Sequence, residues 1–126
     1  MGIIGAHMLL YSTEAEALRA VLRDVFGFRF VDAGGGWLIF ALPPAELGVH
    51  PADGSTPGED VHHEVSMMCD DIQATVADLR TRGIRIDGDP VDAGYGITVM
   101  MTLPGGVQIQ LYEPRHPVAI PRTGDA

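Results

Sequence analysis

The sequence is short of basic residues and has only one cysteine, and these shortages exclude several kinds of function. Eight Lys and Arg stand against 17 Asp and Glu, so the formal net charge is −9 at pH 7. Nucleic acids and anionic membrane surfaces both favour basic proteins, so neither is an expected partner. Cys69 alone cannot form an internal disulfide, and no secretion signal is evident. We therefore expect a cytoplasmic protein.

The sequence also lacks long hydrophobic runs. None approaches the roughly 20 residues that a membrane-spanning helix needs, and the aromatic content of 6% is sparse for a site that stacks planar rings. What remains is a chain of 126 residues that is 46% hydrophobic, with a mean hydropathy of +0.15. This length and composition predict a single globular domain over residues 1–126.

One pattern occurs twice along this domain. In each copy an apolar stretch with one polar residue near its start leads into a capped amphipathic helix, and extended segments follow. In the first copy, residues 3–11 are the expected strand, and Thr13 with Glu16 forms a capping box for a helix that ends near Gly27. Strands are expected at 28–31, 37–42 and 45–50, which gives the order βαβββ.

The second copy follows a segment rich in Pro, Gly, Ser and Asp. A strand at 61–69 precedes a helix capped by Asp70 or Asp71 and closed by Gly83. Strands at 84–86, 97–103 and 107–112, with a polar loop at 87–96, complete the unit. The sequence thus predicts module one at about 3–50, a linker at about 51–60, module two at about 61–113 and an extended tail at 114–126.

Several segments of this duplicated chain resemble the vicinal oxygen chelate superfamily, which includes glyoxalase I, bleomycin-resistance proteins and extradiol dioxygenases. The matching segments are His7, Arg23–Phe28, Cys69–Ile72 and Pro104–Pro114. The resemblance implies an α+β fold in which two βαβββ modules form a cupped, mostly antiparallel sheet, with helices on the outer face. It also implies a small-molecule site in the cup. Members range from metal-dependent lyases, isomerases and dioxygenases to metal-free proteins that sequester a drug or metabolite.

The resemblance further implies that metal ligands lie on the first and last strands of each module. His7 matches the first ligand position, Glu64 matches the equivalent position in module two, and Gln110 matches the usual glutamate. Glu64 would also act as the catalytic base. His63 is the rival of Glu64, because a shift of one residue reverses the face to which every side chain of a strand points.

The fourth ligand position falls on Gly48. His50 or Glu46 would supply this ligand only if the strand shifts its register. A set of nitrogen and oxygen ligands of this kind suits Zn²⁺, Ni²⁺, Fe²⁺ or Mn²⁺. The alternative is a cup with no metal, whose polar residues bind the small molecule directly.

The substrate-binding residues are expected on the same strand faces and at the ends of strands. They are Tyr11, Trp37, Ser66, Met68 and Tyr112. Cys69 is expected to be a core thiol and His116 a solvated side chain of the proline-rich tail. A homodimer is the expected assembly, in which that tail is either extended surface or an arm on the partner subunit.

Overall fold

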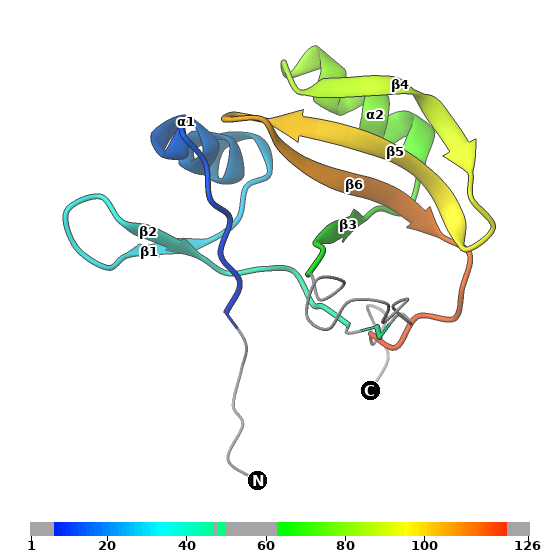
Figure 1. The fold of residues 1–126 in the computed structure, drawn as a ribbon, viewed down its shortest axis with the longest axis horizontal. Helices are drawn as coiled ribbons and strands as arrows, with labels where there is room; N and C mark the ends of the chain where they lie inside the picture. The colour runs from blue at the N-terminus through cyan, green and yellow to red at the C-terminus, as the bar shows by residue number, and fades with distance from the viewer. Residues whose placement is uncertain (1–6, 47, 50–62, 121–126) are drawn as a thin grey trace, which may run out of the picture.

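The computed structural model describes residues 7–46, 48–49 and 63–120, and they form an α+β fold whose larger sheet belongs to the second half of the chain (Figure 1). That sheet has the order β3-β6-β5-β4. β3 pairs with β6 in parallel, and the other neighbours are antiparallel. The strands are β3 (Ser66–Met68), β4 (Arg85–Asp92), β5 (Gly96–Leu103) and β6 (Val107–Pro114), and helix α2 (Ile72–Thr81) covers one face.

Helix α2 begins and ends at residues that the sequence identifies. The Asp71 side chain accepts a hydrogen bond from the Ala74 N–H at 3.1 Å, and Gly83 follows the helix with a φ of 87°. This is the left-handed conformation that glycine adopts most easily. The Glu113 carboxylate accepts from the Ile72 N–H at 3.0 Å, so a side chain of β6 satisfies a second free N–H at the start of the helix.

The core lies between α2 and the sheet. Alternate residues of β5 and β6 point toward the helix, where their side chains are buried. The face of α2 that meets them carries Ile72, Val76 and Leu79 at helical spacing. The most deeply buried side chains are Ile72, Met101 and Ile109, each at 1% exposure.

The first half of the chain is less complete than predicted. Its helix runs through α1 (Ala15–Ala20) and a π-helical turn, η1 (Val21–Val25), close to the predicted bounds. A small antiparallel sheet of β1 (Phe30–Asp32) and β2 (Leu38–Phe40) follows. Figure 1 shows this hairpin beside α1 and apart from the larger sheet.

Two predicted strands of module one are not strands in the described residues. Residues 7–11 of the first, and residues 45, 46, 48 and 49 of the last, have no strand pairing; the rest of both predicted strands lies outside the described residues. β3 is the edge of the larger sheet on that side, and among the described residues no strand of module one pairs with its free backbone groups.

The predicted capping box of Thr13 and Glu16 is wrong. The residue before the first turn of α1 is Glu14, and no side chain caps the helix. The Ser12 hydroxyl instead donates to the Pro104 carbonyl at 2.8 Å and accepts from the Glu14 N–H at 3.0 Å. The Glu14 carboxylate accepts from the Gly105 N–H at 2.7 Å. Polar groups at the helix start therefore hold the two halves of the chain together.

The predicted polar loop at 87–96 is also wrong, because β4 continues as a strand through Asp92. A shift in its pairing with β5 lies between Asp87 and Val91. Such an irregularity lets a strand pass polar and glycine residues without losing its partner, which is why the composition suggested a loop.

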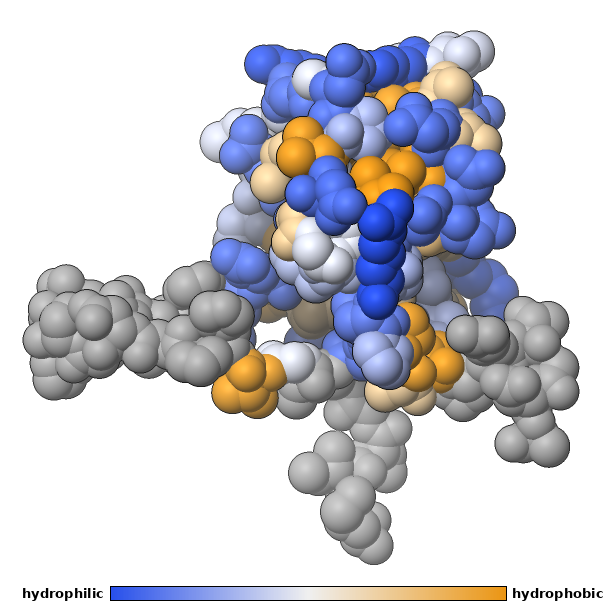
Figure 2. Space-filling model, turned by 90° about the vertical axis from the view of Figure 1, so that its right-hand side faces the viewer, coloured by the Kyte–Doolittle hydropathy of each residue, from blue (hydrophilic) through white to orange (hydrophobic). Residues whose placement is uncertain are grey.

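Hydrophobic side chains are exposed mainly in the first half of the chain. In the described part, nine of the thirteen large exposed ones lie between residues 8 and 49. The face in Figure 2, which is the right-hand side of Figure 1, is by contrast mostly hydrophilic with small hydrophobic patches. No helix among the described residues is long and apolar enough to cross a membrane.

Candidate functional site

The face of the larger sheet opposite α2 brings several predicted site residues together. Ser66 of β3 stands beside Gln110 of β6, and Met68 stands beside Tyr112. Gln110 is in turn paired with Met100 of β5. Since residues paired across neighbouring strands point to the same side, these five side chains share the face that α2 leaves open.

A hollow of about 1810 Å³ runs along the β3 edge of this sheet, between it and the first half of the chain. It is lined by Ser66, Met68 and Tyr112 of the open face, by apolar residues of module one such as Phe26 and Phe28, and by residues 42–46, 48 and 49. Small-molecule pockets measure roughly 300–1000 Å³. One small ligand would therefore fill only part of this space.

A cluster of ionisable side chains borders the hollow. The Tyr112 hydroxyl lies 3.1 Å from Nε2 of His116, and the two rings stack at a centroid distance of 5.9 Å. Oε1 of Glu46 is 3.8 Å from the same Nε2. Glu46 is far in sequence from Tyr112 and His116, which are four residues apart, and all three line the hollow.

The hydrogen bonds of the cluster define where its protons lie. Nδ1 of His116 is 2.8 Å from the Pro117 carbonyl, which can only accept. In the neutral form of His116, Nδ1 therefore carries the proton and Nε2 accepts from the Tyr112 hydroxyl. Burial, with the Glu46 carboxylate and Tyr95 nearby, raises the pKa of Tyr112, so the phenol remains protonated at neutral pH.

Tyr95 extends the cluster along β6. Its ring meets the edge of Tyr112 at a centroid distance of 5.8 Å, and its hydroxyl donates to Oε1 of Gln110 at 2.9 Å. The amide that the resemblance places as a metal ligand thus already has a partner for its oxygen. A carbonyl oxygen has a second lone pair, so this contact leaves Gln110 able to bind one further donor or cation.

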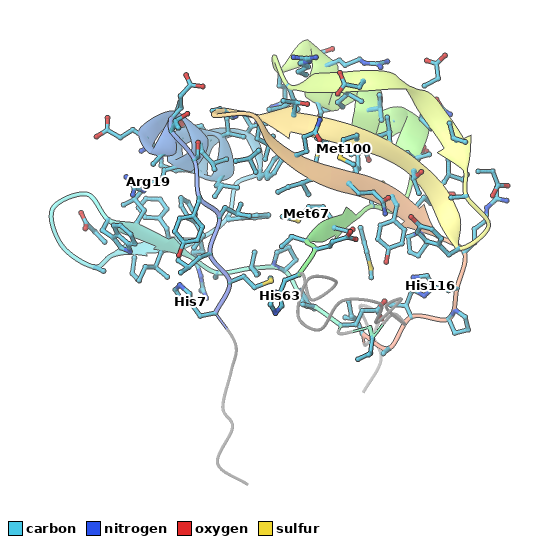
Figure 3. The ribbon with its side chains drawn as sticks, viewed as in Figure 1. His7, Arg19, His63, Met67, Met100 and His116 are labelled. Carbon is cyan, nitrogen blue, oxygen red and sulfur yellow. The ribbon has the colours of Figure 1, made fainter. Side chains whose placement is uncertain are left out.

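The predicted residues of module one lie apart from the cluster. Tyr11 is 86% exposed, and Trp37 lies under the Arg19 guanidinium, which is 5.2 Å from the ring centroid. On the segment before α1, Met8 lines the hollow, and His7 is not among its lining residues. Figure 3 shows His7, His63 and His116 spread along one side of the molecule, each on a different segment.

The described residues do not provide a metal centre. Glu64 lines the hollow beside β3, but no three His, Cys, Asp or Glu side chains gather closely enough to hold an ion within 7–46, 48–49 and 63–120. His50 lies outside the described residues. The set His7, Glu64, Gln110 and His50, for Zn²⁺, Ni²⁺, Fe²⁺ or Mn²⁺, stays a prediction.

Sequence reasoning named Glu46 only as an alternative metal ligand, did not predict its contact with the tail, and was wrong about His116. The His116 side chain is 31% exposed and packs on Tyr112 rather than being solvated. The contact depends on the tail folding back, where the Ala119 N–H donates to Glu46 at 2.8 Å across 73 positions of sequence. No local pattern signals such a contact.

Cys69 is partly buried and packs against the core. Burial raises the pKa of its thiol, and the carboxylates of Glu113, Asp70 and Asp71 act in the same direction, against a hydrogen bond with Thr75 that lowers it. The thiol is therefore the less reactive protonated form at neutral pH.

Solved structures of similar fold come from several bacteria. TnmS3, an antibiotic binding protein from Streptomyces sp. CB03234, has 23% sequence identity and a TM-score of 0.62, with 90% of this chain and 98% of that chain covered. Lactoylglutathione lyase from Agrobacterium tumefaciens has 19% identity and a TM-score of 0.59, with coverages of 90% and 94%. At these identities the likeness establishes the fold alone.

A third structure, a glyoxalase/bleomycin resistance protein from Streptomyces sp. CB03234, has 24% identity and a TM-score of 0.54, with 82% of this chain and 95% of that chain covered. No curated protein matches the sequence. The family model described as Glyoxalase/Bleomycin resistance protein/Dioxygenase superfamily matches residues 5–111. The chain therefore belongs to the glyoxalase/bleomycin resistance protein/dioxygenase superfamily.

Proposed function

We propose that this protein binds a small molecule, a drug or a metabolite, in the hollow beside β3, and that binding requires no metal. The observation that carries the proposal is the lining of the hollow, where methionine, phenylalanine and proline side chains stand together with polar ones such as Glu46, Ser66 and His116. Ligand pockets typically combine these features. An antibiotic-binding protein among the solved structures of similar fold supports the same class of function.

Methionine side chains make such a lining adaptable. Met8, Met67, Met68 and Met101 all border the hollow, and their unbranched, polarizable side chains can adjust to ligands of different shape. Sequestration of a small molecule needs affinity and no catalytic group. A cytoplasmic location is part of the proposal, since the chain has one cysteine and can form no internal disulfide.

The test is whether the protein binds a neutral aromatic probe, 2-naphthol, as measured by calorimetry and by thermal unfolding. Ser66 is exposed on β3 and lines the hollow, so the indole of Ser66→Trp should occupy the part of the hollow next to the open sheet face and weaken binding there at least about tenfold without loss of stability. When the free probe is at a hundred times its dissociation constant, the free energy of unfolding of the wild type should rise by about 2.7 kcal/mol. Val91→Trp, on the exposed face of β4, is the matched control. Equal binding by both variants would show that the probe does not occupy the hollow.

A metal-dependent lyase or dioxygenase activity is the second candidate, and it rests on the predicted ligands His7, Glu64 and Gln110. A bound Zn²⁺, Ni²⁺, Fe²⁺ or Mn²⁺ would polarise two adjacent substrate oxygens, with Glu64 as base. Elemental analysis after readdition of each metal tests it. One equivalent of metal, lost in His7→Ala, is the expected result of this candidate; no metal retained by wild type would remove it.

We also propose that the protein is a homodimer. The first half of the chain exposes large apolar side chains at residues 8–11, 30–31, 37, 42 and 49, and large exposed apolar patches commonly mark protein–protein interfaces. A second copy would cover them and provide a pairing partner for the 7–11 segment. Sedimentation equilibrium should give twice the chain mass of 13.5 kDa, whereas a single-chain mass at micromolar concentration would contradict the dimer.

A further inference from the structure

We propose that Glu46, Tyr112 and His116 form a recognition site for a protonated primary amine on the ligand that the hollow holds. The inference rests on the proposed binding function and adds a chemical class to it. Its basis is the arrangement of hydrogen-bond acceptors in the part of the lining formed by Glu46, Tyr112 and His116, together with the aromatic ring contacts of Tyr112.

The cluster presents acceptors and has few donors to offer. The Tyr112 hydroxyl donates its hydrogen bond to Nε2 of the neutral His116, and its oxygen keeps lone pairs that can accept from another donor. A hydroxyl that donates in this way becomes a better acceptor, because hydrogen bonds in a chain polarise one another. An ammonium group has three donors and no acceptor, so it complements this arrangement.

Glu46 supplies the charge. Its Oε2 accepts from the Ala119 N–H at 2.8 Å, which holds the carboxylate in place. Its Oε1 is 3.8 Å from His116, beyond hydrogen-bonding distance, and so has room for a closer donor. A carboxylate fixed before the ligand arrives loses little conformational entropy on binding.

The surroundings favour a cation with an apolar body. The Glu46 carboxylate acts electrostatically on Tyr112, whose ring also contacts those of Tyr95 and His116, and aromatic rings attract ammonium groups. Met68 is paired with Tyr112 across the strands and lines the hollow, so it can contact the apolar part. The nearest guanidinium along the chain, that of Arg115, is bound to Asp92 at 2.9 Å and does not neutralise Glu46.

The experiment compares three probes of nearly equal size by calorimetry at pH 7. They are phenethylamine, a cation at this pH like the lysine ammonium, its neutral analogue 2-phenylethanol, and the anion 3-phenylpropanoate. Wild type should bind the amine at least about tenfold more tightly than the alcohol, since hydrogen bonds to charged groups contribute about 1.5–3 kcal/mol. The anion should bind least.

Glu46→Gln keeps an acceptor for the Ala119 N–H and removes the charge. This variant should bind the amine only as tightly as it binds the alcohol, and its affinity for the alcohol should equal that of the wild type. Asp89→Asn removes the same charge from an exposed position on β4, at the opposite edge of the sheet from β3, and should preserve the preference for the amine. Tyr112→Phe, as a second variant, should reduce the preference severalfold.

The outcomes separate this inference from the proposed function. If the amine and the alcohol bind wild type equally, or if the preference survives in Glu46→Gln, the amine site is overturned and small-molecule binding in the hollow stands. If none of the three probes binds while 2-naphthol does, the amine site is likewise overturned. If no probe of either set binds, both proposals fail.

Discussion

Replacement of Ile109 by alanine is expected to lower the free energy of unfolding by about 3 kcal/mol, within the range for large-to-small changes in cores. Ile109 is 1% exposed and belongs to the core cluster between α2 and the sheet. β6 is also paired on both sides, with β3 and with β5. The cavity left by Ile109→Ala therefore weakens the one strand on which the larger sheet depends. Urea denaturation measures the change.

The matched control for that experiment is Val91→Ala on β4. Val91 is 63% exposed, so its truncation should change stability by less than about 0.5 kcal/mol. Because the whole stability of such a domain is about 5–15 kcal/mol, Ile109→Ala should also reduce ligand binding at elevated temperature by unfolding the β6 residues of the hollow. Equal losses in the two variants would contradict the assigned core.

The second half of the chain was predictable because its local signals agree with its packing. The alternation of apolar residues in β5 and β6 matches the buried face, and Asp71 and Gly83 delimit α2 as their residue types suggest. Each signal depends on residues close together in sequence. β4 is the exception, since its glycine and aspartates favour a turn while pairing with β5 holds it as a strand.

The first half was less predictable because contacts from afar compete with its local signals. The Thr13 and Glu16 pattern suggests a capping box, but Ser12 and Glu14 bind the turn that follows β5 instead. The 7–11 segment has the composition of a strand, yet the described residues include no strand paired with it. Hydrophobic composition alone does not predict which other strand a strand pairs with.

The residues of the candidate site also differ in whether local sequence signals predict them. Ser66, Met68, Gln110 and Tyr112 share a face because strand alternation places them there. The contact of Glu46 with His116 and Ala119 depends on the path of the tail. That path has no signature in the sequence beyond Pro114 and Pro117, which only exclude a continued helix or central strand.

Gly105→Ala is the second change with a large expected effect, a loss of about 3 kcal/mol of stability. Gly105 has a φ of +83°, and an added Cβ would collide with Oγ of Ser12 and approach the Thr13 nitrogen at 3.1 Å. The left-handed conformation costs a residue with a side chain about 1–2 kcal/mol, and overpacking adds a similar amount. The collision would separate the start of α1 from the turn between β5 and β6.

Gly106→Ala is the matched control, because Gly106 has a φ of +76° and nothing within 4 Å of an added Cβ. It should show the conformational cost alone, about 1 kcal/mol. The difference between the two variants therefore reports the contact between the halves of the chain, and hydrogen exchange at the Leu18 amide should increase only in Gly105→Ala. If both variants lose equal stability, the halves do not meet at this turn in solution. The hollow beside β3, whose far wall is the first half of the chain, would then lack the shape on which the proposed binding depends.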